Sequence, residues 1–221
     1  MGYTFQWGTV LVHMPDLLAG AWLTILLSAQ AMVGGLLIGM VCAVVRRYGA
    51  RPLAFLVACY VEFIRNTPLL VQLFFVFFAL PFMGMRLDPN SAALVALTIN
   101  LGAYATEIVR AGLEAVPNGQ IEAGRALGLK RLQIIRFLVI FPAIKAVYPA
   151  LTSQFILLLL GTSIVSAISA EDLTGVANTL FFNDTATTEI YTIVAGMYVV
   201  IALSFKAAFW GIHRAVFAGR G

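Results

Sequence analysis

The sequence predicts an all-α integral membrane protein, on the strength of its composition, the length of its apolar runs and the placement of its cations. Of 221 residues, 61% are hydrophobic and only 11% are charged. A soluble domain carries about 25% charged residues, so a soluble fold of this length would lack charges to cover its surface. Lipid leaves only helices or closed barrels as spanning structures, and these apolar runs are too long for barrel strands. We expect one membrane domain over residues 1–221.

Five apolar stretches are long enough, or nearly so, for the about 20 residues that a helix needs to cross a bilayer. The first is uncharged and ends before Arg46-Arg47, the third is uncharged as far as Thr106, and the fifth is interrupted by Lys206. That lysine lies near the end of its span, where its side chain can reach water. The expected spans are residues 17–45, 55–80, 91–110, 146–170 and 190–212.

The N-terminal segment and the cysteines indicate neither a processed leader nor a redox site. Residues 1–16 contain no Lys or Arg, so the charged start of a cleavable signal peptide is missing, and we expect the first span to be a permanent anchor. Cys42 and Cys59 lie in or beside apolar runs without CxxC spacing. We expect both to be buried small side chains, with no disulfide or metal site.

Lys and Arg residues alternate between the two sides of the predicted spans. The first and third loops and the tail hold Arg46, Arg47, Arg51, Arg125, Lys130, Arg131, Arg136, Arg214 and Arg220. The opposite set is nearly free of cations, and the loop after the fourth span is acidic. Because cytoplasmic loops are enriched in Lys and Arg, we expect the N-terminus outside and the C-terminus in the cytoplasm. The net charge of +4 then needs no nucleic-acid partner.

The connection between the third and fourth spans, residues 112–142, is longer than two packed helices require. Residues 117–119 (Pro-Asn-Gly) predict a turn, residues 120–127 a short helix that Gly128 stops, and residues 130–140 a second short helix. The pattern is amphipathic. Two interpretations stay open: a helix lying on anionic lipid at the membrane surface, or a docking element for a cytoplasmic protein.

The first of these short helices has the sequence Glu122-Ala123-Gly124-Arg125-Ala126-Leu127-Gly128, and Ile140-Phe141-Pro142 follows. This resembles the EAA loop of ATP-binding cassette (ABC) importer permeases, which has Glu-Ala-Ala, three residues, a Gly, then a hydrophobic pair and Pro. Residues 65–72, 148–155 and 163–171 are similar to the polar amino acid permease family, that of the histidine and glutamate/aspartate permeases. The resemblance covers nearly the whole chain.

Three departures from the family pattern stand out. Gly124 replaces the usual third residue, Ala, and Pro142 falls one position later than in the commonest motif. Residues 181–192, FFNDTATTEIYT, do not resemble the family and read like translated sequencing adapter. The hypothesis that they are an assembly artefact is tested by resequencing the locus, and recovery of the same codons would end it.

The resemblance implies a type I ABC importer permease fold with a cytoplasmic coupling helix, in the cytoplasmic (inner) membrane of a bacterium. It implies a second permease subunit, identical or paralogous, a pair of ABC ATPase subunits, and an extracytoplasmic binding protein that delivers an amino acid. The chain has no GxxxxGK[ST] phosphate loop, so we expect no enzyme activity and no cofactor here, with ATP and Mg²⁺ in the ATPase. The implied coupling residues are Glu122, Ala123, Gly124, Arg125, Ala126, Leu127, Gly128, Leu129 and Pro142, with Glu122 a polar contact or cap.

Charged and polar residues within or near the spans have two interpretations. Glu62 with Arg65, and Glu107 with Arg110, are spaced i, i+3 and can neutralise each other near the cytoplasmic helix ends. Polar side chains inside the spans can form helix–helix hydrogen bonds; these are Asn100, Thr152, Ser153, Gln154, Thr162 and Ser163. The alternative is a gate or translocation path, for which the candidates are Glu62, Arg65, Asn100, Glu107, Arg110, Gln154 and Ser163.

Pro68 and Pro149 should mark breaks or span starts, because proline lacks a backbone donor.

The main rival to an ABC importer is a secondary transporter or channel driven by an ion gradient, which could use Glu62 or Glu107 for protons. The long helical loop disfavours that rival, and a purely structural scaffold ranks third.

Overall fold

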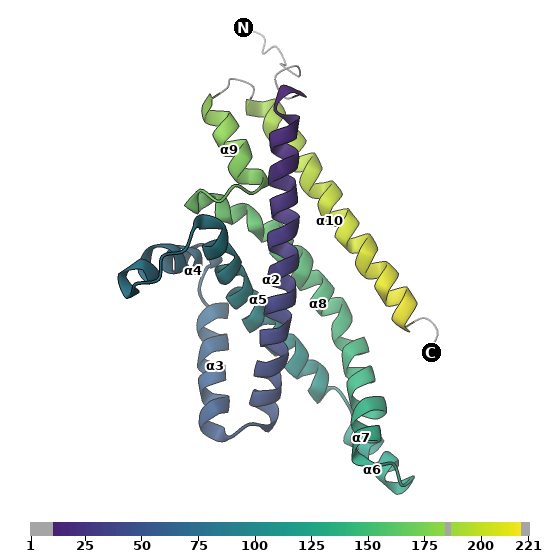
Figure 1. The fold of residues 1–221 in the computed structure, drawn as a ribbon. Helices are drawn as coiled ribbons and strands as arrows, with labels where there is room; N and C mark the ends of the chain where they lie inside the picture. The colour runs from purple at the N-terminus through teal and green to yellow at the C-terminus, as the bar shows by residue number, and fades with distance from the viewer. Residues whose placement is uncertain (1–10, 184–186, 218–221) are drawn as a thin grey trace.

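The computed structural model describes residues 11–183 and 187–217 and shows a bundle of long helices (Figure 1). Helix α2 (Met14–Tyr48) runs along the bundle against α5 (Pro89–Glu114). In this described part, 4 helices are long and apolar enough to cross a membrane: Met14–Tyr48, Pro89–Glu114, Arg131–Ile168 and Thr188–Phe217.

The predicted second span, residues 55–80, is not one straight helix. Helix α3 (Arg51–Arg65) is followed by α4 (Leu69–Phe74), the π-helical η1 (Phe75–Ala79) and the 3₁₀ turn η2 (Leu80–Met83). The two halves are bent by 109°. Pro68 explains the break, because it lacks an N–H and disfavours helical geometry in the preceding residue. The predicted total of five spans holds only if this bent pair counts as one crossing.

Small side chains let α2 and α5 approach closely. Gly35 and Gly39 on α2 are both buried. A Cβ atom added to Gly35 would lie 2.7 Å from the Leu101 Cβ, and one added to Gly39 would lie 2.5 Å from the Ala105 Cβ. Lipid tails are as apolar as the helix surfaces, so the hydrophobic effect does not drive helices together in a membrane. Close backbone packing of this kind is therefore a main source of helix association.

The fourth span begins earlier than the sequence predicts. Helix α6 (Asn118–Ala126) confirms the first short helix of the loop, but the second, expected over residues 130–140, is not separate. Instead α7 (Arg131–Gln133), the π-helical η3 (Ile134–Ile140), α8 (Phe141–Gly161) and the 3₁₀ segment η4 (Thr162–Ile168) follow one another and form the continuous apolar helix Arg131–Ile168.

Two prolines inside this helix do not break it. Pro142 has no N–H, and its ring clashes with the carbonyl four residues earlier in a regular helix. The chain widens into the π-helical η3 just before it. Pro149 lies inside α8, so the expectation that it marks a break or a span start is wrong.

Helix α9 (Leu173–Asn183), which the sequence analysis did not expect, lies between η4 and α10 (Thr187–Phe217). Its first residue, Leu173, donates its N–H to the Thr24 hydroxyl on α2 (3.0 Å). The Asp172 carboxylate accepts the N–H of Gly175 (2.9 Å) and so caps the first turn. The acidic loop that follows the fourth predicted span therefore contains the capped start of α9, and this start contacts α2.

The α2–α3 turn and the α6–α7 loop lie at one end of the bundle, and the C-terminal end of α10 points toward it (Figure 1). The cysteines differ from expectation. Both thiols are free, but Cys42 is only partly buried and Cys59 is exposed.

Candidate functional site: the helical loop and the polar helix break

Helix α6 ends in a Schellman turn, the usual device by which a glycine closes a helix. Gly128 has φ of 73°, a conformation that L side chains rarely adopt. The Leu129 N–H donates to the Gly124 carbonyl (3.0 Å), and the Gly128 N–H donates to the Arg125 carbonyl (3.0 Å). The predicted stop at Gly128 is confirmed.

Gly124 is the point where α6 contacts the following helix. It is buried, and a Cβ atom there would lie 2.5 Å from the Leu138 Cδ1 and 3.3 Å from the Ile134 Cγ1. The absence of a side chain at Gly124 therefore lets α6 pack closely against η3. Ala123 is exposed, so its small size serves no contact within the chain.

The other face of α6 is left open. Glu122 and Ala126 are exposed there, and the Leu127 side chain at the helix end is 80% exposed. No side-chain hydrogen bond caps the start of α6, so Glu122 is not a cap here. Pro142 lies away from this face, inside the following long helix.

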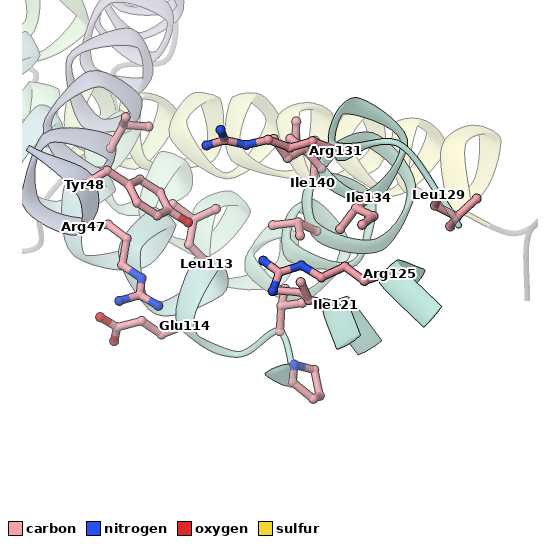
Figure 2. Close-up of a pocket in the computed structure, with 15 residues that line it drawn as sticks. Arg47, Tyr48, Leu113, Glu114, Ile121, Arg125, Leu129, Arg131, Ile134 and Ile140 are labelled. Carbon is pink, nitrogen blue, oxygen red and sulfur yellow. The ribbon is translucent and has the colours of Figure 1, made fainter. Parts of the chain in front are cut away.

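A cavity of about 1020 Å³ separates α6 and η3 from the ends of α2 and α5. Figure 2 shows Arg125 and Arg131 on one side of the hollow, with Arg47 and Tyr48 on the opposite side. The spacing of charges in the sequence could not reveal this cavity, because its walls come from five elements, α2, α5, α6, α7 and η3.

The polar helix break (residues 62–72 with Asn100) lies where α3 turns into α4. The Gln72 side-chain amide donates to the Ile64 carbonyl (2.7 Å) and to the Thr67 carbonyl (3.0 Å). Asn100 on α5 donates to the Gln72 Oε1 (2.9 Å). The helix–helix hydrogen-bond interpretation is confirmed for Asn100. Gln72 was missed, although a glutamine four residues after Pro68 in an apolar run was a usable signal.

The expected Glu62–Arg65 pair does not form. Glu62 accepts a hydrogen bond from the Asn66 side chain (3.1 Å), and the Arg65 guanidinium lies 5.5 Å from the Tyr104 ring centroid. Both lie near the C-terminal end of α3; along the helix axis Glu62 is about 16 Å and Arg65 about 21 Å from Arg51, at 1.5 Å per residue. They are therefore far from the helix end where the sequence analysis placed them, and both are exposed.

The second predicted pair is confirmed within a larger network. Glu107 accepts from Arg110 (2.7 Å) and from Arg46 on α2. Arg110 also pairs with Glu114 (2.7 Å). Sequence spacing missed Arg46 because it lies on another helix. The network joins α2 to α5 near the end that holds the helical loop.

The last candidates belong to the fourth span and, among the described residues, share no hydrogen bond with the break. Thr162 and Ser163 donate to carbonyls of their own helix, Leu159 (2.7 Å) and Leu160 (3.0 Å). Gln154 is half-buried on α8. No hydrogen bond or ion pair between described residues joins Gln154 or Ser163 to the polar helix break.

These features define a class of protein. Long apolar helices, a polar break between two sharply bent helices and a helical loop at one end are typical of a membrane transport subunit. Among the residues that the structure describes, no three or more metal-binding side chains lie together.

Comparison with known proteins identifies the family. Residues 35–216 match the model of the "Binding-protein-dependent transport system inner membrane component" family. The chain therefore belongs to this family of transport permease subunits. It is 35% identical over 201 residues to the glutamine transport system permease protein GlnP of Escherichia coli (strain K12), covering 90% of this chain and 92% of that one. It is 38% identical over 184 residues to the probable glutamine ABC transporter permease protein GlnM of Bacillus subtilis (strain 168), covering 83% and 85%.

Solved structures agree. A crystal structure of an amino acid ABC transporter with histidines superposes with a TM-score of 0.88 and 35% identity, covering 96% of this chain and 100% of that one. The MetNI methionine ABC transporter, in an inward facing conformation, superposes with a TM-score of 0.75 and 26% identity, covering 92% and 97%. The resemblance to amino acid ABC permeases and the type I ABC permease fold are thereby confirmed.

Proposed function

We propose that this chain is the membrane-spanning subunit of an ATP-driven importer that moves amino acids into a bacterial cell. The observation that carries the proposal is the open face of α6. A helix stopped by a Schellman turn and fixed to η3 at Gly124 presents Glu122 and the 80% exposed Leu127 beyond the bundle. A rigid helix whose outer face is left open offers a preformed surface to a protein partner, because less order is lost on binding.

The partner in this proposal is a pair of ABC ATPase subunits in the cytoplasm. The helix Arg131–Ile168 leads without a break from the loop into the bundle. Movement of the ATPases would therefore reach the spans as a rigid-body motion, which is a common form of switching between access states. A second permease subunit and an extracytoplasmic binding protein complete the assembly, with the N-terminus outside and the C-terminus in the cytoplasm.

The polar helix break is the proposed translocation path or gate. Transporters bind cargo near the membrane midplane where spans are discontinuous, and the 109° bend is such a discontinuity. Glu62 and Arg65 remain exposed at the edge of the break, and the hydrogen bond between Gln72 and Asn100 joins the break to α5. Gln154 and Ser163 on the fourth span are proposed to face the path from the other side. Glu107 and Arg110 are proposed to hold the helices together nearer the helical loop.

Two substitutions in α6 test the coupling role. Glu122→Lys reverses an exposed charge and Gly128→Arg strains the Schellman turn, so each is expected to lower ATPase co-purification and amino acid uptake at least about tenfold, a loss of roughly 1.4 kcal/mol in coupling. Uptake is measured in proteoliposomes with the ATPase, ATP and the binding protein.

Matched controls lie away from the loop. Glu171→Lys changes an exposed carboxylate, and Gly84→Arg changes another glycine of positive φ (84°) with open space around it. Both should leave assembly intact. Unchanged assembly and uptake in the α6 variants would contradict the proposal, as would uptake abolished by an uncoupler but untouched by ATP depletion, which would favour an ion-gradient transporter.

A further inference from the structure

The cavity beneath the bundle is large enough to hold a ligand. Its volume of about 1020 Å³ is at the upper end of the range for small-molecule sites, about 300–1,000 Å³. It lies where α2 ends at Tyr48 and α5 ends at Glu114, with α6 and η3 as the other wall. The spans that the sequence predicts end close by, at residues 45 and 110, which places the cavity at the membrane surface.

The cavity carries unneutralised positive charge. Arg47, Arg125 and Arg131 line it from three elements. The ion pairs between described residues include none of the three. Glu114 is a lining carboxylate, but Arg110 already holds it at 2.7 Å. Three guanidinium groups facing one hollow indicate an anionic occupant, and guanidinium suits the oxygen geometry of phosphate.

The rest of the lining is aliphatic, and much of it is uncovered. Val44, Ile135 and Ile140 line the cavity and are 51%, 37% and 44% exposed. A free phosphate would match the arginines and leave this apolar surface in water. An acidic peptide would match the arginines but has few apolar groups to cover a wall that continues into the membrane helices. A molecule with an anionic head and hydrocarbon chains matches both parts.

We propose that this cavity binds an anionic phospholipid, whose phosphate contacts Arg47, Arg125 and Arg131 and whose acyl chains cover Val44, Ile135 and Ile140. Basic pockets between membrane helices on the cytoplasmic side bind anionic head groups in this way. The bound lipid joins the α2 end to the helical loop, so membrane composition can set the position of the loop. The site is independent of the transported substrate.

Lipid retention tests the proposal directly. The full chain is reconstituted in vesicles of phosphatidylcholine with phosphatidylglycerol, extracted in mild detergent, and its bound lipids are counted by native mass spectrometry. The double variant Arg47→Gln/Arg131→Gln should retain about 30-fold less phosphatidylglycerol, from two lost cation contacts. The control Arg51→Gln/Arg136→Gln removes the same charge from exposed arginines that do not line the cavity, and should retain lipid as the wild type does.

A second variant keeps all three arginines and guards against misfolding. Ile135→Trp fills the cavity and should also reduce retained phosphatidylglycerol, with an unchanged circular dichroism spectrum. Equal retention in the cavity and control double variants would overturn the proposal. Displacement of the lipid by millimolar inorganic phosphate would also overturn it, because that would indicate a simple anion site. Full lipid retention in the cavity variants with loss only of ATPase binding would overturn it as well, because that would assign the cavity to the ATPase. Retention is measured without transport, so it stands or falls apart from the proposed import activity.

Discussion

At Gly39, the contact between α2 and α5 leaves no room for even one methyl group. Its added Cβ atom would lie 2.5 Å from the Ala105 Cβ and 2.9 Å from the Ala105 backbone carbonyl carbon, so backbone would have to move. Overpacking of this kind costs about 1–3 kcal/mol. We expect Gly39→Val to lower the melting temperature of the purified chain. Gly196→Val on α10, with no atom within 4 Å of its added Cβ, is the control and should have little effect; equal loss in both would show that α2–α5 packing is not the cause.

Asp172 predicts an unusual pH dependence. The residue lies outside the four apolar helices, its side chain is fully buried, and this burial raises its pKa despite hydrogen bonds from Gly175, Thr174 and Tyr198. The folded chain thus holds this proton more tightly than the unfolded chain. The resulting stability is present below the ordinary aspartate pKa and is lost as pH rises through the raised pKa.

The substitution Asp172→Asn removes that titration. The melting temperature of the variant minus that of the wild type should therefore increase as pH rises above the ordinary aspartate pKa of about 4. Asp88 supplies a control of opposite sign, because its carboxylate accepts the Ser91 N–H (3.1 Å) and this holds its pKa below the ordinary value. Asp88→Asn should lose stability relative to the wild type as pH rises toward the ordinary aspartate pKa of about 4, and the difference should stay constant above it. Parallel slopes for the two variants would refute the assignment.

Among the elements, the bend between α3 and α4 depends on the side-chain amide of Gln72. Gln72 satisfies carbonyls that the end of α3 leaves open and also binds Asn100 on α5. Gln72→Leu keeps the volume but leaves these buried groups without their partner, at a cost of about 2 kcal/mol. We expect a lower melting temperature and slower uptake. Gln30→Leu, on an exposed position of α2, should change neither; a harmless Gln72→Leu would mean that Pro68 alone sets the bend.

A following proline explains both π-helical segments, and its place in the sequence could have predicted them. The segment η1 (Phe75–Ala79) ends two residues before Pro81, and η3 (Ile134–Ile140) ends two residues before Pro142. Each proline lacks a donor and crowds the carbonyl four residues earlier, and an extra residue in the preceding turn relieves that crowding. Pro68 instead follows residues that have their own polar capping groups, Asn66 and Thr67, and there the helix stops.

This contrast explains what the sequence could predict. Hydropathy located every long apolar helix, and Gly128 fixed the end of α6, because both signals are local. The bend after Arg65 and the fusion of residues 130–140 with the fourth span depend on how each proline is accommodated. The Arg46–Glu107 pair and the cavity depend on which helices meet, a property that no single window of sequence contains.

At the scale of the whole molecule, the proposed orientation is the premise on which coupling and lipid binding at the cytoplasmic side depend. Accessibility of single cysteines tests it, in a chain whose exposed Cys59 and half-buried Cys42 are first replaced by Ala. Asp16→Cys and Glu171→Cys, at exposed positions, should react with an impermeant maleimide in intact cells, because the flanking loops carry few cations.

The opposite end should behave in the converse way. Tyr48→Cys and Leu127→Cys, at side chains that are 67% and 80% exposed, should react only after the membrane is permeabilised. Adding the ATPase should then protect the cysteine at 127, on the open face of α6, and leave the one at 48 reactive, because only the former lies on the proposed docking surface. A cysteine at 127 that reacts in intact cells would reverse the orientation, and one that the ATPase never protects would remove the mechanical link between the helical loop and ATP hydrolysis.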